Sequence, residues 1–252
     1  MSNYDNQPVR YGTTVGGAAE AVDEGLRAHM LRVYNYMTIG LVITGLTAYG
    51  TFALSFNEVA GQLVPTAIGQ AIFGSPLMWV IVFAPLALVF FLSFRIDKMS
   101  VGAAQLTFWV YAALLGVSIS FIFVAYTMTS ITQVFFITAA TFGAMSLWGY
   151  TTKRDLTGMG SFLFMGLIGI IIASLVNIFL QSSALGFAVS IIGVLVFAGL
   201  TAYDTQKIKE MYYVGDDGTV AGRKAIMGAL SLYLDFINLF LMLLRLFGQN
   251  RN

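Results

Sequence analysis

Apolar residues run along this 252-residue chain in long stretches that show no two-residue alternation. Seven stretches come close to the roughly 20 residues that a helix needs to cross a bilayer. They are residues 34–54, 77–94, 103–126, 132–150, 161–180, 185–203 and 229–247. A run such as FLFMGLIGIIIASLVNIFL (162–180) lacks the alternating polarity of a transmembrane β-barrel strand. The pattern predicts an all-α integral membrane protein with seven transmembrane helices.

Polar residues dominate only the first 30 positions. This segment has no apolar core after a basic start, so it does not have the pattern of a cleavable signal peptide. We expect residues 1–30 to form a polar cytoplasmic tail, helical over 18–32, and the first span to act as an uncleaved insertion signal. No linker rich in Pro, Gly or Ser separates the later spans, so residues 31–252 are predicted to be a single membrane domain.

Basic residues occur only on alternate sides of the predicted spans, up to the start of the seventh. The loops after the first, third and fifth spans contain no Lys or Arg, whereas the N-terminal segment and the loops after the second, fourth and sixth spans do. Cytoplasmic loops carry the excess of positive charge. The N-terminus is therefore predicted to be cytoplasmic. Arg245 and Arg251 fall at the opposite end, so either the seventh segment is re-entrant or two late charges are tolerated.

Composition supports lipid as the solvent of this chain. Only 10% of the residues are charged, against about 25% in soluble domains. The basic residues are scattered, which argues against nucleic acid as a partner, and the absence of cysteine excludes disulfides and thiolate chemistry. The single histidine, His29, is expected to be solvent-exposed and cannot make a metal site alone. Because no zinc, nucleophile-elbow or P-loop motif is present, we predict neither an enzyme nor a resident cofactor.

Two aspartates lie in or at the end of apolar spans, where an ionised side chain raises the free energy of membrane insertion. Asp235 falls within the seventh span and Asp204 ends the sixth, and an ionised carboxylate at bilayer depth costs roughly 2.5 to 3.5 kcal/mol on insertion scales. Consecutive spans are antiparallel, so the two carboxyl groups are expected at similar depth, facing each other. Asn238, one turn after Asp235, is a candidate hydrogen-bond donor to it.

Two carboxylates close together in a site of low dielectric share a proton. When protonated, the pair can form a hydrogen bond that holds the two helices together. When deprotonated, it repels itself and offers the oxygen ligands that calcium prefers. We therefore hypothesise a pH sensor and gate, which is also a transient metal site, at Asp204 and Asp235, titrating between about pH 6 and 8. The alternatives are that Asp204 is an interface residue or helix cap, and that Asp235 makes a purely structural helix–helix bond.

An intramembrane aspartyl protease also pairs aspartates on neighbouring helices. Tyr203 and Asp204 match the YD of its usual signature. The partner motif GxGD is absent, because Asp235 lies in LYLDF. The protease is therefore a weaker alternative.

The segments AYDTQKIK (202–209) and ALSLYLDFINLFLMLLRLFG (229–248) together resemble the C-terminal signature of the Bax inhibitor-1 family, and the polar tail is similar to that of bacterial members. The resemblance covers the chain from about residue 28 to its end and implies a location in a bacterial inner membrane. It implies six helices around a central seventh, and a proton-sensitive calcium leak in which Asp204 and Asp235 are the sensor.

The resemblance also implies a basic residue after the second helix that latches onto the first aspartate. Arg95 is the nearest match, although SFRIDKMS departs from a plain basic run; alternatively, Arg95 and Lys98 are interface anchors. Some bacterial relatives modulate a membrane-bound quality-control protease instead. A regulatory membrane protein that acts through such a partner, without transport, is therefore the alternative function.

Overall fold

The computed structural model describes residues 14–251, and within them helices predominate. Seven helical segments of this part are long and apolar enough to cross a membrane, which confirms the predicted class. The helices are α1 (Thr14–Ser55), α2 (Ala67–Phe73), α3 (Leu77–Arg95), the 3-10 turn η1 (Ile96–Lys98), α4 (Val101–Ile119), α5 (Ile122–Ala125), α6 (Met128–Thr151), α7 (Thr157–Leu180), α8 (Ser183–Glu210) and α9 (Gly218–Phe247). The third predicted span is divided between α4 and α5.

The predicted tail, residues 1–30, lies partly outside the described residues. Within the described part, the chain is already helical at Thr14, and α1 continues without a break to Ser55. The stretch predicted to be helical before the first span is therefore the beginning of the same helix.

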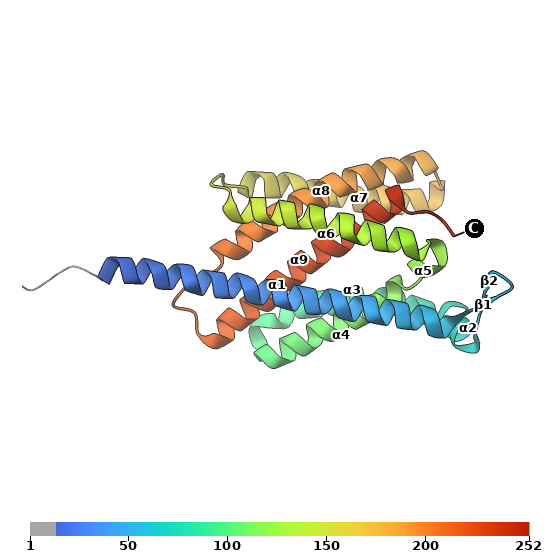
Figure 1. Cartoon of the computed structure of the whole chain (residues 1–252), viewed down its shortest axis with the longest axis horizontal. Coiled ribbons are helices and arrows are strands. Elements are labelled where there is room, and N and C mark those ends of the chain that lie inside the picture. Colours follow the sequence, from blue (N-terminus) through green and yellow to red (C-terminus); the bar gives the residue numbers. More distant parts are fainter. Residues whose placement is uncertain (1–13, 252) are drawn as a thin grey trace, which may run out of the picture.

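A β-hairpin and a short helix follow α1 and were not predicted. Strands β1 (Phe56–Val59) and β2 (Gln62–Pro65) pair antiparallel, and the turn between them places Ala60 and Gly61 at positive φ. The hairpin and α2 lie at the end of α1 away from its N-terminus (Figure 1). The apolar-run search missed them because they are too short to span a bilayer.

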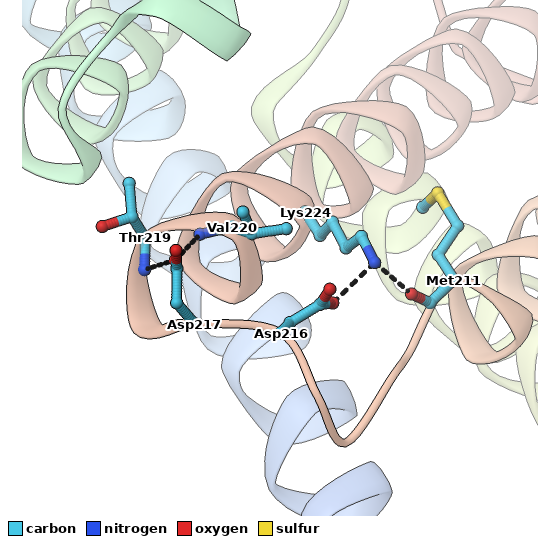
Figure 2. Close-up of polar contacts among 6 residues, drawn as sticks. All are labelled: Met211, Asp216, Asp217, Thr219, Val220 and Lys224. Atoms are coloured by element: carbon cyan, nitrogen blue, oxygen red, sulfur yellow. Dashed lines mark hydrogen bonds and ion pairs between the residues drawn. The ribbon is translucent and has the colours of Figure 1, made fainter.

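The largest boundary error concerns the connection between the last two spans. It was predicted over 204–228, but α8 continues to Glu210 and α9 begins at Gly218. The Asp217 side chain caps α9 by accepting the N–H groups of Thr219 and Val220, each at 2.8 Å. Lys224 then closes the loop onto Asp216 (Figure 2). Polar helix ends such as these are invisible to a search for apolar runs.

The long helices form two groups with α9 between them. Helices α1, α3 and α4 make one group, and α6, α7 and α8 make the other; α9 runs obliquely between the groups and contacts α1, α4, α6 and α8 (Figure 1). In the apolar window of α9, 72% of the residues are buried, against at most 39% in any other span. Helix α9 therefore meets protein along most of its circumference. Because it is one continuous helix of 30 residues, the re-entrant alternative is wrong.

Hydroxyl groups join the helices inside this apolar core. The Tyr233 hydroxyl of α9 lies 2.6 Å from that of Thr44 in α1. Ser146 of α6 lies 2.5 Å from the Tyr34 hydroxyl of α1 and 2.9 Å from the Thr205 hydroxyl of α8. Buried polar groups need such partners, and these bonds tie both helix groups to one another.

His29 is buried, and the prediction that it is exposed was wrong. Only 6% of its surface is accessible, its ring centroid lies 5.8 Å from that of Tyr212, and its Nε2 atom has no hydrogen-bond partner among the described residues. Tyr212 belongs to the loop after α8, and this loop packs against α1 at Gly25 and His29. The contact between His29 and Tyr212 joins residues far apart in the sequence, so the polarity of the residues around His29 could not predict it.

Candidate functional site

A cavity of about 880 Å³ lies between α7, α8 and α9. Helix α8 packs against both of the other two helices. The wall contributed by α7 is apolar apart from Ser161 and Ser174, whereas α8 and α9 contribute the ionisable groups Asp204, Lys207 and Asp235. The cavity therefore combines a lipid-like wall with a charged one.

Asp235 is the buried member of the aspartate pair. Its side chain is 5% exposed, and its Oδ2 atom has no hydrogen-bond partner among residues 23–251, whose side chains the structure describes. Asp204 is half-buried and lines the same cavity, where its carboxyl group neighbours that of Asp235. The structure therefore brings the two predicted residues together.

The antiparallel register of α8 and α9 produces this meeting. The Lys224 ammonium donates to the carbonyl oxygen of Met211, and Gly228 packs against the Ile208 side chain. Asp235 lies 17 residues after the start of α9, about 25 Å at 1.5 Å per residue. The two carboxyl groups come together because both helices extend past their predicted ends at the same side.

The basic residue at the cavity is Lys207. It lies one turn after Asp204 and faces the same cavity, and its ammonium lies 5.9 Å from the ring centroid of Tyr203. Arg95, the predicted latch, is exposed at the end of α3, a helix that packs against α4 in the other group. The structure does not bring Arg95 to the pair. The spacing of Asp204 and Lys207 in AYDTQKIK was the available signal, because residues three apart share a helix face.

Asn238 and Tyr203 both line the cavity. The Asn238 amide does not donate to Asp235; its Nδ2 atom donates to the Leu234 carbonyl of the same helix at 2.8 Å. The predicted bond to Asp235 is not formed. The ring of Tyr203 packs against Gly160 of α7, which closes one side of the cavity.

The described residues contain no group of three or more His, Cys, Asp and Glu side chains that could hold a metal ion. Two carboxylates are too few for a structural calcium site, which takes 6–8 oxygen ligands. A cation here would keep most of its water ligands and would bind transiently.

The fold and the cavity define a multi-pass, all-α membrane protein in which two carboxyl groups line one cavity between α7, α8 and α9. Residues 26–252 match the family model described as "Inhibitor of apoptosis-promoting Bax1". The chain belongs to the Bax inhibitor-1 family.

Bacterial relatives match over nearly the whole chain. An uncharacterized protein of Rickettsia prowazekii is 52% identical over 91% of this chain and 93% of its own length. The inner membrane protein YbhL of Escherichia coli K12 is 49% identical, covering 90% and 94%. An uncharacterized membrane protein of Streptococcus pyogenes serotype M3 is 39% identical, covering 90% and 95%. These matches agree with the family and the membrane class predicted from the sequence.

Proposed function

We propose that this protein is a pH-sensitive cation leak, with calcium the favoured ion, gated by Asp204 and Asp235. One observation carries the proposal. The Asp235 carboxyl group is buried within a membrane-spanning helix, has an oxygen without a partner among the described residues, and shares a cavity with a second carboxyl group. Ionisable residues inside membranes are costly, and they mark ion paths and proton relays.

Protonation of the pair would work as the gate. A shared proton neutralises one carboxylate and lets the pair hold α8 and α9 together. Loss of that proton leaves two negative groups that repel each other and attract a hard cation. Lys207, at the mouth of the same cavity, would compete with the cation for the freed carboxylates.

The orientation and the membrane are part of the proposal. The alternation of basic loops favours a cytoplasmic N-terminus, and the name of the relative YbhL favours the inner membrane. With this orientation, the α8–α9 loop and the aspartate end of the cavity face the cytoplasm.

Calcium uptake into proteoliposomes tests the proposal. Flux would be measured at about pH 6, 7 and 8 for the wild type, Asp204→Asn and Asp235→Asn. Asp97→Asn, which removes an exposed carboxylate of η1, is the matched control. We expect a pH-dependent flux that either cavity substitution flattens and the control leaves unchanged.

Absence of flux above that of empty vesicles at every pH would refute the leak. It would favour the alternative of a regulatory membrane protein that modulates a membrane-bound protease or another partner. Flux that neither cavity substitution alters would leave a leak but remove the aspartate pair as its gate.

A further inference from the structure

A second cavity, of about 870 Å³, adjoins the aspartate cavity at the other end of α7, α8 and α9. Ser174 and Ile178 of α7 line both cavities, so the two form one groove along these helices. The aspartates lie in one half of the groove. Arg245, in the last turn of α9, lies in the other, which we call the arginine half.

Arg245 is the only charged side chain of the described residues that lines the arginine half. No described carboxylate lines it, and among the side chains of residues 23–251 the only ion pair joins Lys224 to Asp216. The other arginine near this end, Arg251, is engaged: it donates to the Phe123 carbonyl oxygen and lies over the Phe52 ring. The arginine half therefore carries a net positive charge with no counter-ion among the side chains that the structure describes.

The remaining polar groups of the arginine half add hydrogen-bond donors. Ser183 and Ala184 form the first turn of α8, and both line the cavity. The first backbone N–H groups of a helix have no acceptor within it. The Ser182 side chain accepts the N–H group of Leu185, and its backbone carbonyl accepts that of Gly186. The N–H groups of Ser183 and Ala184 are left for a ligand. A guanidinium beside free helix N–H groups suits an anionic oxygen ligand.

The other surfaces around the arginine half are apolar and open outward. Ile178 of α7 and Phe187 of α8 line it and are 66% and 61% exposed. In a membrane-spanning protein, such exposed apolar side chains meet hydrocarbon. A ligand with an anionic headgroup and an apolar tail matches both parts of this surface. In a bilayer, the molecule with this chemistry is an anionic phospholipid.

We propose that the arginine half of the groove binds the headgroup phosphate of an anionic phospholipid, with an acyl chain lying against Ile178 and Phe187. A zwitterionic headgroup suits the site less well, because no carboxylate lines the arginine half to receive its ammonium group. The inference is independent of cation transport, so it stands or fails separately from the proposed leak.

Lipid titration of the purified full-length protein in detergent, followed by native mass spectrometry, tests the site. We expect phosphatidylglycerol to bind more tightly than phosphatidylcholine, and Arg245→Gln to weaken phosphatidylglycerol binding about tenfold, the loss of one charge-assisted hydrogen bond. Arg95→Gln is the matched control, because Arg95 is also exposed in the last turn of a spanning helix but lines neither half of the groove.

A second pair of variants tests the site by shape and leaves its charge in place. Ala184→Trp fills the arginine half from an exposed position, whereas Ala188→Trp, one turn later, is exposed and outside it. We expect only Ala184→Trp to reduce binding.

Three outcomes would overturn the proposal. Equal binding of the two lipids, unchanged by Arg245→Gln, would remove the anion preference. Unchanged binding in Ala184→Trp would place the lipid elsewhere. Inorganic phosphate that binds in an Arg245-dependent way, while phosphatidylglycerol binding does not depend on Arg245, would make the ligand a free anion and not a lipid.

Discussion

Replacing Gly149 by alanine tests the closest approach between two spanning helices. Gly149 of α6 faces the backbone of Ala202 in α8, and a Cβ atom at Gly149 would lie 2.8 Å from the Cα atom of Ala202 and nearer still to its carbonyl oxygen. Carbon atoms pack at about 3.5 to 4.0 Å, so the helices must separate by about 1 Å. Backbone cannot rotate away as a side chain would, and the nearby hydroxyl bond between Ser146 and Thr205 would lengthen as well.

The expected loss follows from two opposing effects. Overpacking costs about 1 to 3 kcal/mol, and a clash with backbone falls in the upper part of this range, about 2 to 3 kcal/mol, of which alanine recovers about 1 kcal/mol through its helix propensity. A net loss of about 1 to 2 kcal/mol corresponds to a melting temperature about 3 to 6 °C lower in a chain of this size.

Thermal unfolding in detergent, followed by circular dichroism, measures the shift. Gly143→Ala is the control in the same helix, because a Cβ atom there would meet nothing within 4 Å; we expect it to be neutral or slightly stabilising. If Gly149→Ala melts at the same temperature as Gly143→Ala, the two helices do not approach as closely as described.

Three further changes follow from individual contacts. Tyr233→Phe removes the buried hydroxyl bond to Thr44 and should cost about 1 kcal/mol, measured as a lower melting temperature; no additional loss in the double variant with Thr44→Val would show that the bond accounts for the effect. Lys224→Met breaks the partly buried ion pair with Asp216 and should cost at most about 1 kcal/mol, with a difference from wild type that shrinks as salt is added. Hydrogen bonds from Thr157 lower the pKa of Asp155. The ionised Asp155 side chain therefore stabilises the folded protein fully above the ordinary carboxyl pKa, and this contribution disappears as the pH falls through the lowered pKa. Asp155→Asn should thus melt below wild type at neutral pH and match it in strong acid, and a pH-independent difference would contradict this linkage.

The helical class could be predicted because the bilayer imposes a length on each span. Six of the seven predicted spans correspond to one long helix each, and the third to the consecutive helices α4 and α5. The ends could not be predicted, because Asp217 and Lys224 stabilise the start of α9 through caps and loop contacts that hydropathy does not register. The hairpin after α1 was missed for a similar reason, since its pairing and not its polarity defines it.

The candidate site was predictable only in part. Asp204 and Asp235 stood out because a carboxylate in an apolar run has an energetic cost that can be recognised without a structure. Arg95 was predicted to reach the aspartates but lies away from them, because α8 packs against α7 and not against α3. Which helices become neighbours depends on the packing of the whole bundle and cannot be read from a single span. Lys207 and the arginine half of the groove were overlooked because exposed basic residues near helix ends usually lie in the interface.

The position of α9 has a consequence for biosynthesis. Helix α9 is translated last, yet it supplies the surface on which both helix groups pack. Until the ribosome releases it, the two groups expose to lipid, or to each other, faces that carry groups such as Thr44, whose hydroxyl partner lies on α9. We therefore expect the bundle to close only after translation ends. Chains cut before Gly218 should then insert but be recognised by the cell as incomplete and degraded, even though six of their seven spans are present.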